Sequence, residues 1–399
     1  MTRYFDFRFI DSSEVSEDTN WAIKRENIQA DGVVFAIIPE KDEEIEGLRA
    51  ILKKSTAGCV DCVFVIPNRY QDIRSAVSEF DAVQILMQTV DDDPVLFEDF
   101  DPDKYKVDFI KKDKILNLVP EEINDNCEKV INALDRALFF FQTRCGIRTI
   151  GEINYNLMLV LVGTLFMEDS YFYNYEVHRL LEAWYWSVVF SGEYDKDQNS
   201  HMISNLQNIV RCVSGTNRDL TWLNSISANV LKMTNFSDKD LLLMNKVNED
   251  RYPKPVLRNF MCQYLLSGTY MDMFDETKKI SVFCEDADTL EAHHIIPLGS
   301  AKKVGEITAD IRKNPRHICN SPLNFVYITK AANKDISDDA LDAYEKKIQP
   351  AAKAALFISS YTPASHDTEI KVRGLLESRY SMMQGTISGE INDLLTNWM

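Results

Sequence analysis

The chain has 399 residues, of which 45% are hydrophobic and 27% charged, a composition typical of a folded globular protein of two or three domains. Acidic residues outnumber basic ones by 62 to 44, and the formal net charge of −18 argues against general affinity for nucleic acid over the whole surface. There is no apolar run of the roughly 18 residues that span a bilayer, no signal peptide and no disulfide framework. We therefore expect a cytoplasmic protein without a membrane segment.

Residues 1–110 are predicted to form a small α/β docking domain. The apolar runs 32–39 and 62–67 are typical of short buried strands, and residues 43–54 between them have helical spacing. This order predicts a β-α-β unit with a parallel strand pair. Neither strand is followed by a Gly-rich phosphate loop, so the sequence gives no support for nucleotide binding in this domain.

Residues 111–275 are predicted to form a helical domain. Apolar residues recur every three or four positions, which predicts helices at 123–145, 155–167, 174–190, 200–213, 232–244 and 256–267. One of these stretches contains Trp184, Tyr185, Trp186 and Phe190, separated by aliphatic residues. We expect these aromatic side chains to pack in the core rather than to stack on bases.

The residues with the clearest chemistry lie in the third predicted domain, 276–399. The run Leu290-Glu-Ala-His-His-Ile-Ile-Pro297 predicts a short strand that ends on His293 and His294. Neighbouring side chains of a strand point to opposite sides, so one imidazole can hold a metal ion while the other faces a water molecule. Hydrolysis of a phosphodiester needs both a cation on the phosphate and a base for the water.

A second strand follows Asn324 (Phe-Val-Tyr-Ile), and a helix is predicted over Lys330–Ile336. This order of strand, strand and helix resembles the HNH nuclease motif, a ββα fold that grips one metal ion. The resemblance implies that His294 is the general base, that Asn324 fixes its imidazole, and that His293 and Asn333 bind the metal.

The predicted ligand set is small. Some HNH proteins have a further ligand four residues after the position of Asn333, where this chain has Ser337, a poor ligand. Few protein ligands and several waters favour one Mg²⁺ or Mn²⁺ ion over a closed structural zinc site. Asn320 and His317 are interpreted as a turn residue and a loop residue.

A local basic rim is predicted beside the site despite the acidic total. The rim consists of Lys302, Lys303, Arg312, Lys313, Arg316, Lys330 and Lys334, whose charges can attract phosphate while the body of the protein stays acidic. The candidate substrate-binding residues are Lys330, Lys334 and Arg316. Such an enzyme should bind DNA weakly alone, which indicates a partner. Beyond the motif, further helices are predicted at 338–347, 351–360, 365–380 and 387–398.

A second resemblance concerns Leu180–Tyr194, which is similar to the helical segment of GmrSD-type restriction proteins, anti-phage nucleases with an HNH-like domain. Their N-terminal Asp-Gly-Gln-Gln-Arg signature is absent here. The resemblance therefore implies the nuclease half of a prokaryotic defence or restriction system, with an ATPase or nucleotide-sensing partner subunit.

The sequence predicts an α+β, mainly α protein with an N-terminal α/β domain, a central helical domain and a C-terminal ββα-metal nuclease domain. Three hypotheses for its function stay open. They are a metal-dependent DNA endonuclease, an HNH-type RNase, and a non-cleaving scaffold that binds nucleic acid or a partner.

Overall fold

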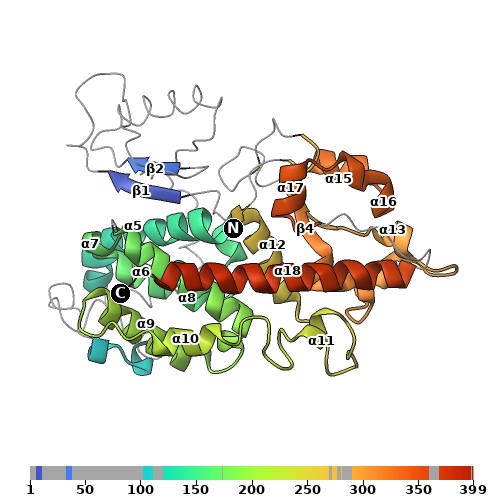
Figure 1. Cartoon of the computed structure of the whole chain (residues 1–399). Coiled ribbons are helices and arrows are strands. Elements are labelled where there is room, and N and C mark those ends of the chain that lie inside the picture. Colours follow the sequence, from blue (N-terminus) through green and yellow to red (C-terminus); the bar gives the residue numbers. More distant parts are fainter. Residues whose placement is uncertain are drawn as a thin grey trace, which may run out of the picture.

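The structure is a computed structural model, and it describes residues 6–10, 33–37, 102–110, 120–172, 174–268, 272–275, 280, 290–358, 368–396 and 398. These residues are mainly helical with two two-stranded sheets, in agreement with the predicted α+β, mainly α class (Figure 1). None of the described helices has both the length and the apolar character needed to cross a bilayer. The helices, with η for 3₁₀ turns, are η4 (Pro102–Lys104), η5 (Val107–Ile110), α5 (Pro120–Cys145), η6 (Ile150–Glu152), α6 (Asn156–Phe166), α7 (Asp169–Phe172), α8 (Tyr175–Ser191), η7 (Glu193–Asp195), α9 (Gln198–Val213), α10 (Thr221–Ser227), α11 (Lys239–Leu242), α12 (Pro255–Gly268), α13 (Leu298–Ala301), α14 (Thr308–Lys313), η9 (Ile318–Asn320), η10 (Pro322–Asn324), α15 (Lys330–Ile336), α16 (Leu341–Tyr344), η11 (Glu345–Lys347), α17 (Pro350–Ala355) and α18 (Thr368–Thr396).

The N-terminal sheet consists of two parallel strands, β1 (Asp6–Ile10) and β2 (Val33–Ile37). β2 lies inside the predicted strand 32–39, and its partner β1 was not predicted. The predicted helix 43–54 and strand 62–67 lie outside the described residues. The boundary of this domain at residue 110 stays a prediction.

The helices of the central segment follow the predicted apolar spacing, and α5, α6, α8, α9 and α12 agree with the expected ranges to within three residues. The predicted helix 232–244 is wrong except for the short α11. Leu231 and Asn235 have φ values of +55° and +67°, which an α-helix of L-residues excludes, so the chain turns there.

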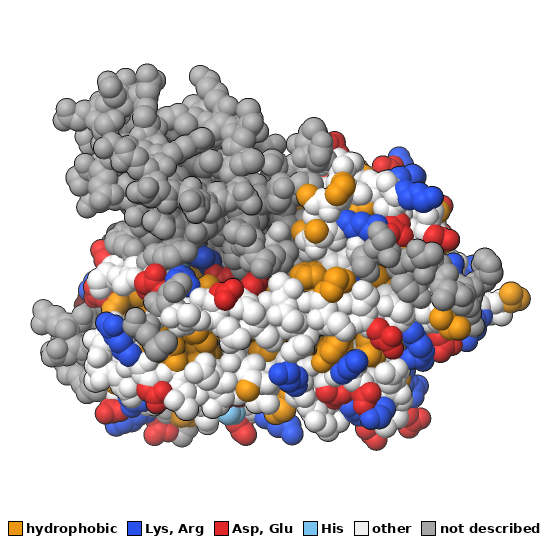
Figure 2. Space-filling view, in the orientation of Figure 1, with side chains coloured by type: hydrophobic (Ala, Val, Ile, Leu, Met, Phe, Trp, Pro, Cys, Tyr) orange, Lys and Arg blue, Asp and Glu red, His pale blue; other side chains and the backbone are white. Residues whose placement is uncertain are grey.

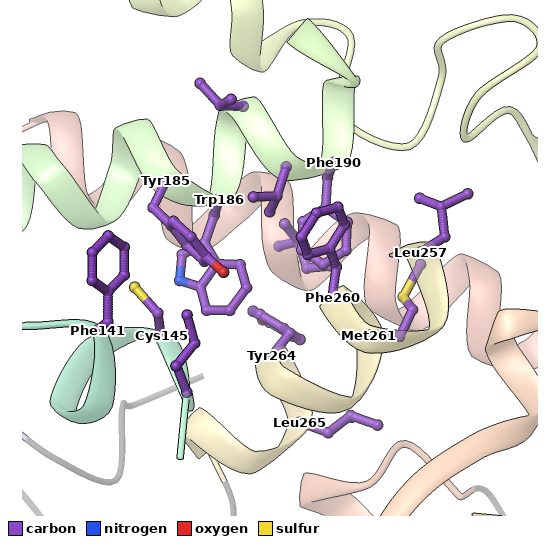
Figure 3. Packing of buried hydrophobic residues seen from close by; sticks show 14 of the residues in the cluster. Phe141, Cys145, Tyr185, Trp186, Phe190, Leu257, Phe260, Met261, Tyr264 and Leu265 are labelled. Carbon is purple, nitrogen blue, oxygen red and sulfur yellow. The ribbon is translucent and has the colours of Figure 1, made fainter. Parts of the chain in front are cut away.

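The core of this segment is aromatic and lies between α8 and α12. Tyr185 and Trp186 of α8 point toward Phe260 and Tyr264 of α12 (Figure 3). The Trp186 and Tyr264 ring centroids are 5.1 Å apart with the planes at 90°, an edge-to-face contact. All four aromatic residues singled out in α8 are buried, so the prediction that they pack in the core is confirmed.

The two predicted C-terminal helices form one long helix, α18. The expected break between residues 380 and 387 is absent. Gly385 lies in this stretch, and a side chain added there would meet nothing within 4 Å, so this glycine lies away from the core. The apolar face continues past it through Met383, Ile387 and Ile391, which are all buried. This continuous face packs α18 along α8 and against α11, η9 and η10, as Figure 1 shows for α8 and α11. The predicted helices 338–347 and 351–360 appear as the shorter α16, η11 and α17.

One hydrophobic core cluster contains residues from both sides of the predicted boundary between 275 and 276. Leu265 of α12, Val326 of β4 and Leu375 of α18 belong to it. The division into a helical and a nuclease domain stays a prediction, but the two segments share their packing.

Candidate active site

The predicted strands and helix of the third segment form a ββα unit. β3 (Glu291–His294) pairs antiparallel with β4 (Phe325–Ile328), and His294 lies opposite Phe325. α15 begins directly after β4, because the hydroxyl of Thr329 accepts a hydrogen bond from the Ala332 backbone N–H at 3.1 Å and caps the first turn. Because Ile328 at the end of β4 lies opposite Glu291, α15 begins beside the start of β3 and contacts that strand.

The two histidines face different elements, as strand alternation requires. The His294 ring packs on Phe325, with centroids 4.2 Å apart, and the guanidinium of Arg258 in α12 lies 5.2 Å from the same Phe325 ring. His293 lies on the other side, next to the side chain of Asn333 in α15. α12, from the predicted helical domain, thus contributes to the face that carries His294.

The orientation of the His294 imidazole is set by Asn320. Nε2 of His294 lies 3.1 Å from Oδ1 of Asn320. The amide of Asn320 cannot be reversed without loss, because its Nδ2 donates to the carbonyls of Ile311 and Asn314 at 2.6 and 2.8 Å. Oδ1 can only accept, so Nε2 of His294 carries the proton and Nδ1 has the lone pair.

The protonation state of His294 fits the role of a base. Burial lowers its pKa to about 4, the hydrogen bond to Asn320 opposes this shift, and the nearby positive charges of Arg312 and Arg258 add to it. Nδ1 of His294 has no hydrogen-bond partner among the described residues. At neutral pH the ring is therefore uncharged, with one nitrogen able to accept a proton.

The prediction that Asn324 fixes the imidazole is corrected. Asn324 is fully buried, and its Oδ1 accepts a hydrogen bond from Ile296 N–H at 2.9 Å while its Nδ2 donates to the carbonyl of Cys319, also at 2.9 Å. These bonds tie the chain after β3 to the turn before β4, so Asn324 is a structural residue of the loop. Asn320 makes the contact with the imidazole, although the sequence suggested only a turn residue there.

His293 and Asn333 lie close together, as the resemblance implies. Nε2 of His293 is buried and has no hydrogen-bond partner among the described residues. Nδ2 of Asn333 donates to the carboxylate of Glu291, so its Oδ1 is the amide atom left to accept from an imidazole or to bind a cation. Burial lowers the pKa of His293, which favours the neutral imidazole. An imidazole nitrogen and an amide oxygen are the donor types that the resemblance implies for the metal.

The described residues contain no group of three or more His, Cys, Asp or Glu side chains placed to hold a metal ion. A metal at His293 and Asn333 would therefore keep several water ligands.

Both histidines, Asn320 and Asn333 line one cleft of about 520 Å³. The basic residues that line it include Arg258, Arg312 and Lys313, which make no ion pair with any other residue that the structure describes. The predicted substrate-binding residues are exposed and do not line this cleft, and their role stays a prediction. These three are Lys330, Lys334 and Arg316.

The positive charge of the side chains that line the cleft is a local feature. On the described part of the face in Figure 2, acidic and basic side chains alternate rather than gather into one large basic surface. Arg312 and Lys313 of α14 belong to the predicted basic rim, whereas Arg258 of α12 lines the cleft from a segment that the sequence did not place beside it.

Comparison of the sequence with protein-family models and with curated proteins gives no match. Inferences about function therefore depend on the ββα unit, the two histidines and the lining of the cleft.

Proposed function

We propose that the protein is a divalent-metal-dependent HNH-type endonuclease that hydrolyses phosphodiester bonds of DNA. The observation that carries this proposal is the arrangement around His294. Asn320 fixes the tautomer, Nδ1 has the lone pair, and the metal-binding pair His293 and Asn333 lines the same cleft. The unpaired cations of α12 and α14 support a polyanionic substrate in that cleft.

The chemistry follows from these groups. Nδ1 of His294 removes a proton from water as the water oxygen attacks phosphorus, forming one P–O bond while the bond to the leaving 3′ oxygen breaks. The products are a 5′-phosphate and a 3′-hydroxyl, as the HNH resemblance implies. Oδ1 of Asn320 stabilises the imidazolium that forms, because it accepts from Nε2–H. A divalent cation held by His293 and Asn333 would supply charge stabilisation at the phosphate.

The biological setting is proposed from the resemblance of Leu180–Tyr194 to GmrSD-type proteins. We propose a cytoplasmic anti-phage defence or restriction nuclease whose residues 1–110 dock an ATPase or nucleotide-sensing subunit. Deletion of residues 1–110 should abolish co-purification of that subunit, and retained association would refute the docking role.

The test of the reaction is incubation of the purified full chain with supercoiled plasmid and Mg²⁺ or Mn²⁺. We expect nicked and linear products, no product in EDTA, and a loss of about 10²–10⁴ in rate for His294→Ala. His201→Ala is the matched control, because His201 lies on α9 beside Glu193 and does not line the cleft. Equal cleavage by His294→Ala and the wild type would contradict the proposal.

The same experiment separates the two alternatives. An RNA substrate digested in parallel identifies an HNH-type RNase by preferential cleavage of RNA. The non-cleaving scaffold is favoured by the small ligand set and the net charge of −18. Binding of DNA without cleavage under any metal condition would support the scaffold.

A further inference from the structure

The turn after α15 places a carboxylate in the cleft that the HNH resemblance did not predict. Asp338 lines the same cleft as His293 and Asn333. We propose that Asp338 is a third protein ligand of the divalent cation and replaces the ligand missing at Ser337. This inference rests on the proposed metal-dependent function and adds a residue to its metal site.

The backbone before Asp338 has an unusual conformation. Ser337 has φ +49° and ψ −116°, a combination that non-glycine residues rarely adopt and that persists only where the surroundings impose it. Hydrogen bonds hold the turn on both sides, from Ser337 N–H to the Asn333 carbonyl at 3.0 Å and from Asp339 N–H to the Ile336 carbonyl at 2.9 Å. The chain therefore leaves α15 abruptly, with Asp338 at the turn.

The Asp338 carboxyl group also lies against the backbone of α13. A Cβ added at Gly299 would be 2.2 Å from both Cγ and Oδ1 of Asp338, much closer than any real contact. Only a glycine at position 299 allows this approach. Asp338 is exposed, and its contact with α13, which begins four residues after His294, places the carboxylate at the wall of the cleft.

The carboxylate has no competing partner. Asp338 makes no hydrogen bond or ion pair with the residues that the structure describes, although cations line other parts of the cleft. Its negative charge acts on the His293 ring, whose buried Nε2 also has no partner in that part of the chain. Asp338 and His293 both line this cleft, and a cation held between them would complement the carboxylate and an imidazole lone pair.

The donor set also matches the expected metal. A carboxylate oxygen, an amide oxygen and one imidazole nitrogen favour Mg²⁺ or Mn²⁺, which prefer oxygen ligands. In the alternative role, Asp338 only supports the short helix α13, and metal affinity would then not depend on its charge.

The experiment measures Mn²⁺ binding to the full chain without DNA, from the loss of the electron paramagnetic resonance signal of free Mn²⁺. We expect Asp338→Asn to weaken Mn²⁺ binding at least about tenfold, since removal of even an outer-shell partner weakens metal sites by 10–100-fold. Asp339→Asn is the matched control, because it removes the same charge from the exposed neighbour that does not line the cleft. Circular dichroism in EDTA checks that both variants are folded.

His293→Ala separates this inference from the proposed function. If His293→Ala loses Mn²⁺ binding while Asp338→Asn binds as the wild type does, Asp338 is not a ligand and the metal-dependent function stands. If the wild type itself binds no Mn²⁺ at millimolar concentration, both the inference and the metal-dependent function fail. If Asp339→Asn weakened Mn²⁺ binding as much as Asp338→Asn does, the loss would come from general electrostatics. The assignment of Asp338 as a metal ligand would then be overturned.

Discussion

The Oδ1 atom of Asn320 lies 3.1 Å from Nε2 of His294, and the amide that supplies it is held by two backbone carbonyls on its other side. Through this contact, the amide of a turn residue fixes one tautomer of the His294 imidazole. In that tautomer the lone pair is on Nδ1, the nitrogen without a partner among the described residues.

Removal of this amide should slow hydrolysis without preventing folding. Asn320→Ala lets His294 adopt either tautomer, and we expect kcat for plasmid nicking to fall about 10–10²-fold, the range seen when orienting partners of functional imidazoles are removed. Asn314→Ala is the control, because the Asn314 side chain accepts from Arg316 N–H and not from the imidazole. An unchanged kcat for Asn320→Ala would exclude the orienting role.

A charge at the same position should move the pH profile. The pKa of His294 is about 4 in the wild type, so the base is neutral and the rate should not fall between pH 8 and pH 6 on its account. Asn320→Asp places a carboxylate beside the ring, which favours the imidazolium and raises this pKa. The acid limb of kcat/KM against pH should therefore move to higher pH, and an unchanged limb would mean that His294 is not the titrating base.

Arg258 should contribute to DNA binding from the helical segment. Its guanidinium lines the cleft beside Phe325 without an ion-pair partner in the described chain, so we expect it to contact a phosphate. Arg258→Gln should reduce the slope of log Kd against log salt by about 0.7–0.9, the effect of one lost phosphate contact. Fluorescence anisotropy with labelled duplex DNA in EDTA measures this, with exposed Arg218→Gln as the control. A loss of affinity at unchanged slope would indicate a packing role only.

Gly299→Ala tests the close contact on which the Asp338 assignment depends. The added methyl group would overlap the Asp338 carboxyl group and displace it, so Mn²⁺ affinity should fall. Gly299 lies in α13, where alanine favours a helix, and we expect the fold to be retained. Isothermal titration calorimetry with Mn²⁺ measures the effect, with Gly385→Ala as the control, because a Cβ at this glycine of α18 meets no neighbouring atom. Unchanged affinity in Gly299→Ala would mean that the carboxylate position is irrelevant to the metal.

His178 should make the protein less stable in acid. Its ring is fully buried, Nε2–H donates to the Phe172 carbonyl at 2.6 Å, and burial followed by the positive charge of Arg144 lowers its pKa to about 3. The unfolded chain titrates near pH 6.5 and binds a proton that the folded chain excludes. The contribution is therefore complete above about pH 6.5 and is lost as the pH falls toward about 3.

Urea unfolding at pH 7.5 and pH 4.5 measures this linkage. His178→Gln does not titrate, so its free energy of unfolding should decrease less between the two pH values than that of the wild type. An equal decrease in both proteins would assign the acid sensitivity to other groups.

The ββα unit could be predicted because its signals are local. Alternation, β-branched residues and the adjacent histidines define β3 and β4 within a few positions, and the Thr329 cap marks the start of α15. The partner of the imidazole could not be predicted in this way. Asn320 and Asn324 both precede β4, and only the path of the chain from 295 to 324 decides which amide reaches His294.

The basic lining was predicted only in part. Arg312 and Lys313 belong to the predicted rim and line the cleft, whereas Arg258 was missed. Lys330 and Lys334 are close to the motif in sequence, but they lie on the exposed side of α15. Arg258 is remote in sequence and reaches the cleft because α12 packs on β4. Helical periodicity placed α12 correctly but carried no information about which strand it would contact.

The last helix of the chain has a consequence for the order in which the site is completed. α18 packs against α8 in the helical segment and against η9 and η10, the turns that carry Asn320 and Asn324. During synthesis these turns leave the ribosome before the helix that braces them. A nascent chain that ends before α18 would therefore contain every proposed catalytic residue but not the helix that packs against their turns. The proposed nuclease activity should appear only after α18 has been translated.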